Sequence, residues 1–254
     1  MAAYLAAECG RPAAPVMVSA TAGPVLSALG SGKIDVAYIS PLAYTLYNDE
    51  VENVSLFTSA QHGVLTPLGM PYQDNTRLWE GGIMVRVDSG IKSVKDLRGR
   101  RFAFKYPRSV DGYVYAAAML KAAGIDPVKG VKAVDIHGAS AVTAVFDKQA
   151  DAGCADVESI ESTLVDYSKI DKLKVLQRTD PIPNGVLVAG AVMAPDTAAS
   201  LKKAVAEMNS KLDGQLAMKD VEFDRMAPAV DKDFDSLRKV TRLLHMHAKD
   251  LDTP

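Results

Sequence analysis

The segment Arg108–Tyr113 combines groups suited to holding an anion. It joins a predicted strand over 101–104 to a predicted helix over 112–123, so the N–H groups of the first helical turn lie free at the end of a strand. Those N–H groups and the helix dipole favour a negatively charged ligand. Ser109 adds a hydroxyl, while Arg108 is either a bidentate clamp on an oxyanion or a solvated surface side chain.

Asp111 brings a carboxylate into the same segment. In a dry site, a carboxylate that faces a dianion disfavours binding by on the order of several kcal/mol. The contact becomes favourable only if the ligand donates a proton from an O–H or N–H group. Asp111 therefore predicts a protonated oxyanion, a polyol or an amine-bearing ligand. The alternative is that Asp111 caps the following helix, and both roles can coexist.

A second strand end lies at Ser40, after a predicted buried strand over 34–39. Its hydroxyl and the N–H groups that follow Pro41 are placed to contact a ligand. Tyr44 either lines that site or packs in the core as a helix tyrosine. Trp79, the only tryptophan, lies in a predicted loop, where it either anchors a ligand or packs locally beneath the loop.

Composition excludes several classes of protein. The chain has 254 residues, of which 48% are hydrophobic, and a net charge of −2. It is therefore not a largely disordered chain, and no charge excess indicates nucleic-acid binding. Cys9 and Cys154 stand in isolated contexts, and His245 and His247 do not share a helix face, so no metal or cofactor site is predicted. The motifs of common hydrolases and dinucleotide-binding enzymes are missing.

The elements that must position these residues alternate between strand and helix. The segment 62–80 is expected to be a loop because of its Gly and Pro residues. Alternation of this kind predicts parallel sheets with ligands at the carboxyl ends of the strands. Strands are predicted at 16–18, 34–39, 56–60, 83–87, 101–104, 131–136, 150–155, 173–177 and 186–193, and helices at 22–29, 42–47, 93–97, 112–123, 140–148, 160–167, 195–212 and 234–249.

Five segments in sequence order resemble the PhnD-like substrate-binding proteins of phosphonate, phosphate and phosphite ABC transporters. They are Gly32–Tyr44, Val85–Gly99, Phe102–Phe104 with Ser109–Tyr113, Gln149–Asp156 and Pro181–Asn184. The resemblance implies the α/β type II periplasmic-binding-protein fold, with two mostly parallel sheets, helices on both faces and a cleft between two lobes.

The same resemblance implies how the chain divides. Lobe I is expected to comprise residues 1–98 and 184–254, and lobe II residues 99–183. The crossovers that serve as a hinge are expected near 96–101 and 180–186. The family's first strand precedes the helix that begins here near Ala2, so that strand and a signal peptide are expected to be absent from this chain.

Ligand contacts are implied residue by residue. In the family, the loop matching 109–113 reads Ser-Thr-Ser-Gly-Tyr and holds phosphonate oxygens. Ser109 and Tyr113 match, whereas Val110 and Asp111 replace two hydroxyl residues, which predicts a weak response to simple alkylphosphonates. The family also places aromatic residues in the cleft wall near the positions of Tyr44 and Trp79.

The second lobe supplies three further candidates. Asp156 and Glu158 match a loop whose acidic residue accepts a ligand amine in the family, although both are equally suited to the N-terminus of a helix. His137 either lines the cleft or ends a strand.

The family is not enzymatic, so capture of a small ligand and delivery to ABC permease subunits are expected. The expected protein is a periplasmic or lipoprotein-like monomer that uses no cofactor and binds no nucleic acid. The alternatives are a module that feeds a histidine kinase or receptor, an enzyme on the same fold, and a cytoplasmic location.

Overall fold

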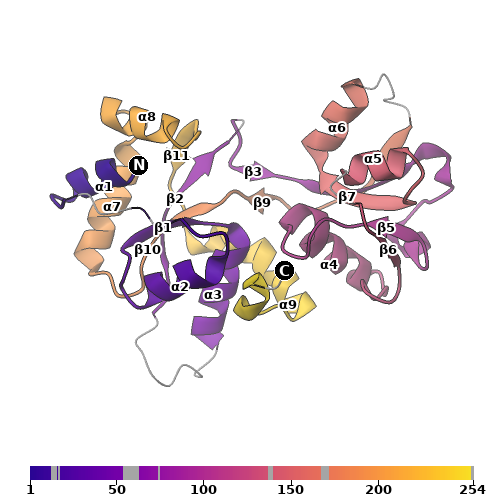
Figure 1. The fold of residues 1–254 in the computed structure, drawn as a ribbon, viewed down its shortest axis with the longest axis horizontal. Helices are drawn as coiled ribbons and strands as arrows, with labels where there is room; N and C mark the ends of the chain where they lie inside the picture. Colours follow the sequence, from indigo (N-terminus) through magenta and orange to yellow (C-terminus); the bar gives the residue numbers. More distant parts are fainter. Residues whose placement is uncertain are drawn as a thin grey trace. The chain divides into compact units, whose positions relative to one another are not determined.

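The computed structural model describes residues 1–12, 16, 18–53, 63–73, 75–136, 140–166 and 172–252 (Figure 1). The chain forms two units, each with its own core. Unit 1 comprises Met1–Leu78, Pro183–Arg238 and Met246–Pro254, and unit 2 comprises Trp79–Ile182 and Lys239–His245. The first division therefore lies at Leu78/Trp79 instead of 98/99, and the segment 96–101 lies within unit 2, because the strand at 81–86 pairs with strands of that unit.

Unit 1 is built on a four-stranded sheet with the order β1-β10-β2-β11, in which every described pair is antiparallel. Its strands are β1 (Val36–Ile39), β2 (Thr66–Tyr72), β10 (Val186–Ala189) and β11 (Arg225–Ala227). Its helices are α1 (Ala2–Glu8), α2 (Ala22–Gly30), α3 (Pro41–Asn53), α7 (Pro195–Glu207), α8 (Leu212–Lys219), η4 (Asp231–Phe234) and η5 (Ala248–Asp252). Helix α9 (Asp235–Leu244) begins in unit 1 and ends in unit 2.

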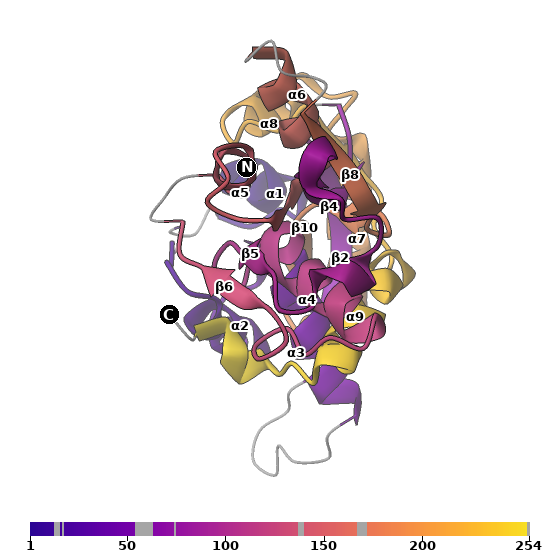
Figure 2. The ribbon, with the colours of Figure 1, turned by 90° about the vertical axis from the view of Figure 1, so that its right-hand side faces the viewer.

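Unit 2 is built on a five-stranded sheet with the order β6-β5-β7-β4-β8, of which Figure 2 labels β6, β5, β4 and β8. Its strands are β4 (Gly81–Arg86), β5 (Arg101–Ala103), β6 (Lys132–Val134), β7 (Ala152–Asp156) and β8 (Leu173–Arg178). Its helices are η1 (Val87–Ser89), η2 (Val94–Leu97), η3 (Val110–Val114), α4 (Tyr115–Ala122), α5 (Ala141–Phe146) and α6 (Val157–Asp166). The short strands β3 (Leu78–Trp79) and β9 (Ile182–Pro183) pair where the chain passes between the units.

The expected mixture of helices and sheets is confirmed, but the expectation of mostly parallel sheets is wrong for the described pairs. Only β5 pairs in parallel there, with β6 and β7. Strand β4 runs antiparallel to both β7 and β8. The reason lies in the path of the chain, because β4 leads into unit 2 and β8 leads out of it, so the two must run in opposite directions.

Strand β2 occupies a segment that was expected to be a loop. Its side chains are buried at Leu68 and Met70, and it lies between β10 and β11 in the sheet. Pro67, which has no N–H to donate, lies opposite Val188, where the register with β10 shifts. The burial of this strand on both sides therefore outweighs the local preference of proline and glycine for turns.

Other differences concern the limits of elements. Val16 and Val18 are exposed and lie outside any strand, and the strand expected at 56–60 falls outside the described residues. The helix expected over 195–212 ends at Glu207. Helix α9 ends at Leu244, since His245 has a φ of 57°. Within the described part of the chain, no helix has the length and apolar character needed to cross a membrane.

Candidate functional site

The helix that follows β5 begins at Val110, two residues earlier than expected, and its first turn is a π-helix that continues into α4. Ser109 caps this helix, because its Oγ accepts a hydrogen bond from the N–H of Gly112 at 3.1 Å. The backbone carbonyl of Ser109 also accepts from the N–H of Tyr113 at 3.0 Å. The expected helix start is thus present, after a loop that separates Val110 from the end of β5 at Ala103. The N–H groups of Gly112 and Tyr113 are already bonded to Ser109.

Asp111 lies inside this first turn and is nearly buried, with 7% of the residue exposed. Its Oδ1 accepts a hydrogen bond from the Ser109 hydroxyl at 2.6 Å, and its Oδ2 accepts one from the Lys105 ammonium at 2.7 Å. Burial alone would raise the pKa of Asp111, but the hydrogen bonds from Lys105 and Ser109 outweigh it and hold the pKa below its usual value. The carboxylate is therefore ionised and paired within unit 2.

Lys105 is the residue that sequence reasoning missed. Its side chain is 36% exposed, against 10% for that of Asp111, so the cation is the more accessible member of the pair. The stem of Lys105 packs on the backbone of Gly112, where an added Cβ would lie 2.6 Å from the lysine Cγ and Cδ. The only signal in the sequence is that Lys105 follows shortly after β5, at the carboxyl end of a strand.

This pairing changes what Asp111 implies about the ligand. The expectation that a dianion is disfavoured assumed an uncompensated carboxylate, whereas the carboxylate is neutralised by Lys105 at 2.7 Å. The candidate site therefore combines a helix start with an ion pair whose charges cancel, and the lysine is the more exposed member of that pair. An unprotonated phosphonate or phosphate is compatible with that arrangement.

Several strand ends meet at the same edge of the unit 2 sheet. Gly81, the first residue of β4, pairs with Asp156, the last residue of β7. A Cβ on Gly81 would lie 3.5 Å from the Cα of Asp111. The N–H of Gly81 donates to Oγ1 of Thr179, just beyond β8, at 3.0 Å. The structure thus brings the predicted residues Ser109, Val110, Asp111 and Asp156 to one edge.

Asp156 acts there as a helix cap. Its Oδ2 accepts hydrogen bonds from the N–H of Ser159 at 2.9 Å and from the hydroxyl of Ser159 at 2.8 Å. Glu158 is exposed on the first turn of the same helix, α6. These contacts favour the capping role for Asp156 over the acceptance of a ligand amine.

The other predicted residues of unit 2 lie around this edge or outside the described part of the chain. Val110 is buried, and Tyr113 is half-buried with its ring 5.1 Å from that of Phe104. Arg108 is half-buried. Trp79 is half-buried in β3, where the chain passes between the units. His137 lies outside the described residues.

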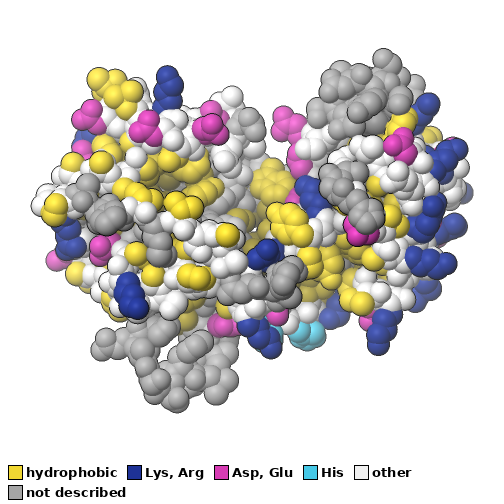
Figure 3. All heavy atoms as spheres, in the orientation of Figure 1, with side chains coloured by type: hydrophobic (Ala, Val, Ile, Leu, Met, Phe, Trp, Pro, Cys, Tyr) yellow, Lys and Arg dark blue, Asp and Glu magenta, His cyan; other side chains and the backbone are white. Residues whose placement is uncertain are grey.

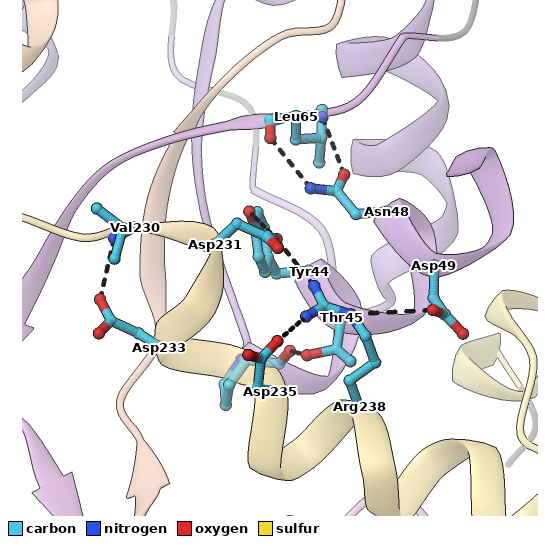
Figure 4. A network of polar contacts seen from close by, with 11 residues as sticks. Tyr44, Thr45, Asn48, Asp49, Leu65, Val230, Asp231, Asp233, Asp235 and Arg238 are labelled. Carbon is cyan, nitrogen blue, oxygen red and sulfur yellow. Dashed lines mark hydrogen bonds and ion pairs between the residues drawn. The ribbon is translucent and has the colours of Figure 1, made fainter. Parts of the chain in front are cut away.

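Ser40 and Tyr44 belong to unit 1, where both have structural partners. Ser40 caps α3, accepting the N–H of Ala43 at 3.1 Å. Tyr44 is fully buried, and its hydroxyl donates to Oδ1 of Asp231 at 2.9 Å (Figure 4). Burial and this hydrogen bond raise the pKa of Tyr44. Arg238 also binds Asp231, at 2.8 Å, so the tyrosine belongs to a packed polar network, which favours its core role.

Neither Cys154 nor a metal cluster offers a reactive centre in the described part of the chain. Cys154 is fully buried on β7, and burial together with the nearby Asp111 raises the pKa of its thiol, so it is protonated at neutral pH. Among the residues that the structure describes, no group of three His, Cys, Asp or Glu side chains could hold a metal ion.

Comparison with known proteins shows similarity over most of the chain. Residues 1–234 match a family model described as the periplasmic substrate-binding protein of a phosphonate ABC transporter. A curated relative, the phosphate-import protein PhnD of Mycolicibacterium smegmatis, is 26% identical over an alignment of 203 residues, with 72% of this chain and 58% of that protein covered. The chain thus matches less than two thirds of that relative's length.

Two solved structures illustrate the shared fold. XAC2383 from Xanthomonas citri, bound to ATP, has a TM-score of 0.72 at 19% identity, with 99% of this chain and 93% of that chain covered. PhnD1 from Prochlorococcus marinus, in complex with methylphosphonate, has a TM-score of 0.62 at 15% identity, with 96% and 90% covered.

Proposed function

Because this chain belongs to the family of periplasmic substrate-binding proteins of phosphonate ABC transporters, we propose that it captures a phosphonate- or phosphate-like oxyanion and delivers it to a permease. The family resemblance and the type II periplasmic-binding-protein fold expected from the sequence are confirmed. The relatives support the ligand class, since one is a phosphate-import protein and another was solved in complex with methylphosphonate.

The observation that carries the proposal is the pairing of a helix start with a cation at the carboxyl edge of the unit 2 sheet. The Ser109 hydroxyl is committed to Asp111, and the N–H groups of Gly112 and Tyr113 are committed to Ser109. The N–H groups of Val110 and Asp111 at the start of the helix supply donors, and the Lys105 ammonium supplies a further donor with positive charge. Each of these groups favours an oxyanion over a neutral ligand. Asp111 is a positioning residue in this arrangement, because it fixes the Lys105 ammonium at 2.7 Å.

On this proposal the protein binds without covalent chemistry. The buried, protonated thiol of Cys154 supports this part, since the thiolate is the reactive form of cysteine. The protein then acts outside the cytoplasm as a monomer, with a small ligand and ABC permease subunits as partners, and with no cofactor or nucleic acid.

Titration calorimetry with methylphosphonate and inorganic phosphate tests the proposal. We expect saturable binding by the full chain and a loss of about tenfold or more in Lys105→Met, because one charge-assisted contact is removed. Lys121→Met is the matched control, since Lys121 lies on α4 and donates instead to the carbonyl of Leu243 at 2.7 Å. If the chain binds neither of the two anions, the ligand class is overturned. If Lys105→Met and Lys121→Met bind them equally well, the assigned site is overturned.

A further inference from the structure

The amino end of the unit 2 sheet gathers exposed basic side chains. In the view of Figure 3, dark blue Lys and Arg side chains collect along one rim of unit 2, at the right of the picture. We call the following set the basic edge, and every member of it is exposed: Arg98, Arg100, Arg101, Lys129, Lys132 and Lys148.

Three chain segments bring these residues together. Arg101 on β5 pairs with Lys132 on β6, and the N–H of Lys132 donates to the carbonyl of Arg100 at 2.8 Å. The N–H of Asp151, three residues beyond Lys148, donates to the carbonyl of Arg101 at 2.9 Å. Strand pairing and backbone hydrogen bonds thus hold the segments of the basic edge side by side in unit 2.

The acidic residues nearby offset part of this charge. Asp151 forms an ion pair with Arg101 at 2.9 Å. Asp126 accepts hydrogen bonds from the backbone N–H groups of Val128 and Lys129, at 2.8 and 2.9 Å, and its negative charge also offsets that of Lys129. Unit 2 as a whole carries 18 Lys and Arg against 14 Asp and Glu, a net +4, whereas unit 1 carries 11 against 17, a net −6. The basic character is therefore specific to unit 2.

The basic edge lies at the opposite end of the sheet from the candidate site. Arg101 begins β5, whereas Lys105 and the helix start at Val110 follow the end of β5. The two regions are therefore separate parts of unit 2. A partner bound to the basic edge would leave the carboxyl edge of the sheet free.

We propose that the basic edge binds the surface of an anionic phospholipid bilayer. Its long side chains are exposed over three segments, and a bilayer of mobile phosphates fits any such spacing, whereas a shaped ligand would not. Val128 is 71% exposed beside Lys129, which adds an apolar contact suited to the interface of a bilayer. Each basic residue held close to an anionic bilayer strengthens binding by roughly fivefold.

Vesicle co-sedimentation of the full chain tests the proposal. We expect binding to vesicles of phosphatidylcholine mixed with phosphatidylglycerol, little binding to phosphatidylcholine alone, and release at high salt. In a variant with Arg100→Gln, Lys129→Gln, Lys132→Gln and Lys148→Gln, four lost charges should weaken binding by on the order of a hundredfold or more.

The matched control removes the same charge from unit 1, by Lys33→Gln, Lys202→Gln, Lys219→Gln and Lys249→Gln, all at exposed positions. It should bind the anionic vesicles nearly as the unaltered chain does. Far-UV circular dichroism and urea unfolding that match those of the unaltered chain show that both variants are folded. Absence of binding to anionic vesicles overturns the proposal, as does equal binding by the two variants or equal binding to both kinds of vesicle.

Discussion

Asp111 and Lys105 decide the charge of the candidate site, and their contact predicts how stability depends on pH. The folded-state pKa of Asp111 lies below the ordinary value of 3.8. Its contribution to stability is therefore complete above that value and is lost as the pH falls through the lower, folded-state pKa. We expect Asp111→Asn to cost about 1–2 kcal/mol at pH 7 in urea unfolding, and much less near pH 2.

Asp147→Asn is the control for this measurement, because Asp147 is an exposed carboxylate of the same unit. It should leave the stability nearly unchanged at both pH values. A cost of Asp111→Asn that is as large near pH 2 as at pH 7 would contradict the assignment of an ion pair.

Tyr44 and Tyr47 form a natural pair for testing a core role. Tyr44 donates to Asp231, whereas the buried Tyr47 hydroxyl has no hydrogen-bond partner among the described residues. We expect Tyr44→Phe to cost about 1 kcal/mol and Tyr47→Phe to be neutral or slightly stabilising in urea unfolding. Neither should alter the affinity for methylphosphonate. A large loss of affinity in Tyr44→Phe would instead place Tyr44 in the ligand site.

The local part of the candidate site could be predicted from the sequence. Ser109 was identified because a strand followed by a helix start is a short-range pattern. The contact of Lys105 with Asp111 was missed, because it depends on how the intervening loop folds back, and no spacing rule reports that. The burial of Tyr44 was likewise left open, since it depends on Asp231 and Phe234, far along the chain.

At the scale of elements, substitutions of Asp156, which caps α6, can distinguish a capping role from a ligand-binding role. An asparagine accepts the same hydrogen bonds from Ser159, whereas an alanine accepts none. We expect Asp156→Asn to retain stability to within about 0.5 kcal/mol and Asp156→Ala to lose about 1 kcal/mol. Both should keep the same ratio of affinities for aminoethylphosphonate and methylphosphonate. Selective loss of aminoethylphosphonate binding in Asp156→Asn would assign the carboxylate to the ligand.

Elements with a clear hydrophobic periodicity or a good helix cap could be predicted. Elements that form because distant segments bury them could not. Ser93 and Asp96 form the capping box that fixes η2, and Gly124, with a φ of 77°, lies just beyond α4. Strand β2 could not be predicted, because its Pro and Gly residues favour a turn locally. Its place in the sheet depends on β10 and β11, which lie more than a hundred positions later in the chain.

At the scale of the whole molecule, separate cores predict separate unfolding. Leu68 and Val205 lie in a core cluster of unit 1, whereas Leu97 and Phe102 lie in one of unit 2. Calorimetry should resolve two transitions. Asp111→Asn should lower one midpoint and Tyr44→Phe the other, each by about 2–4 °C. A single transition that both variants shift equally would show that the units unfold as one.

Helix α9 is a further chain connection between the units, besides the strands β3 and β9. The units are therefore harder to exchange as separate pieces of sequence. It begins in unit 1, where Arg238 binds Asp231, and it ends in unit 2, where Lys121 donates to the carbonyl of Leu243. The chain then returns to unit 1, where the N–H of Ala248 donates to Glu50. Unit 2 is therefore not formed by one continuous stretch of sequence. A chimera that exchanges ligand preference between relatives must graft residues 239–245 together with 79–182, because a graft of the longer segment alone would join a foreign sheet to the end of a native helix.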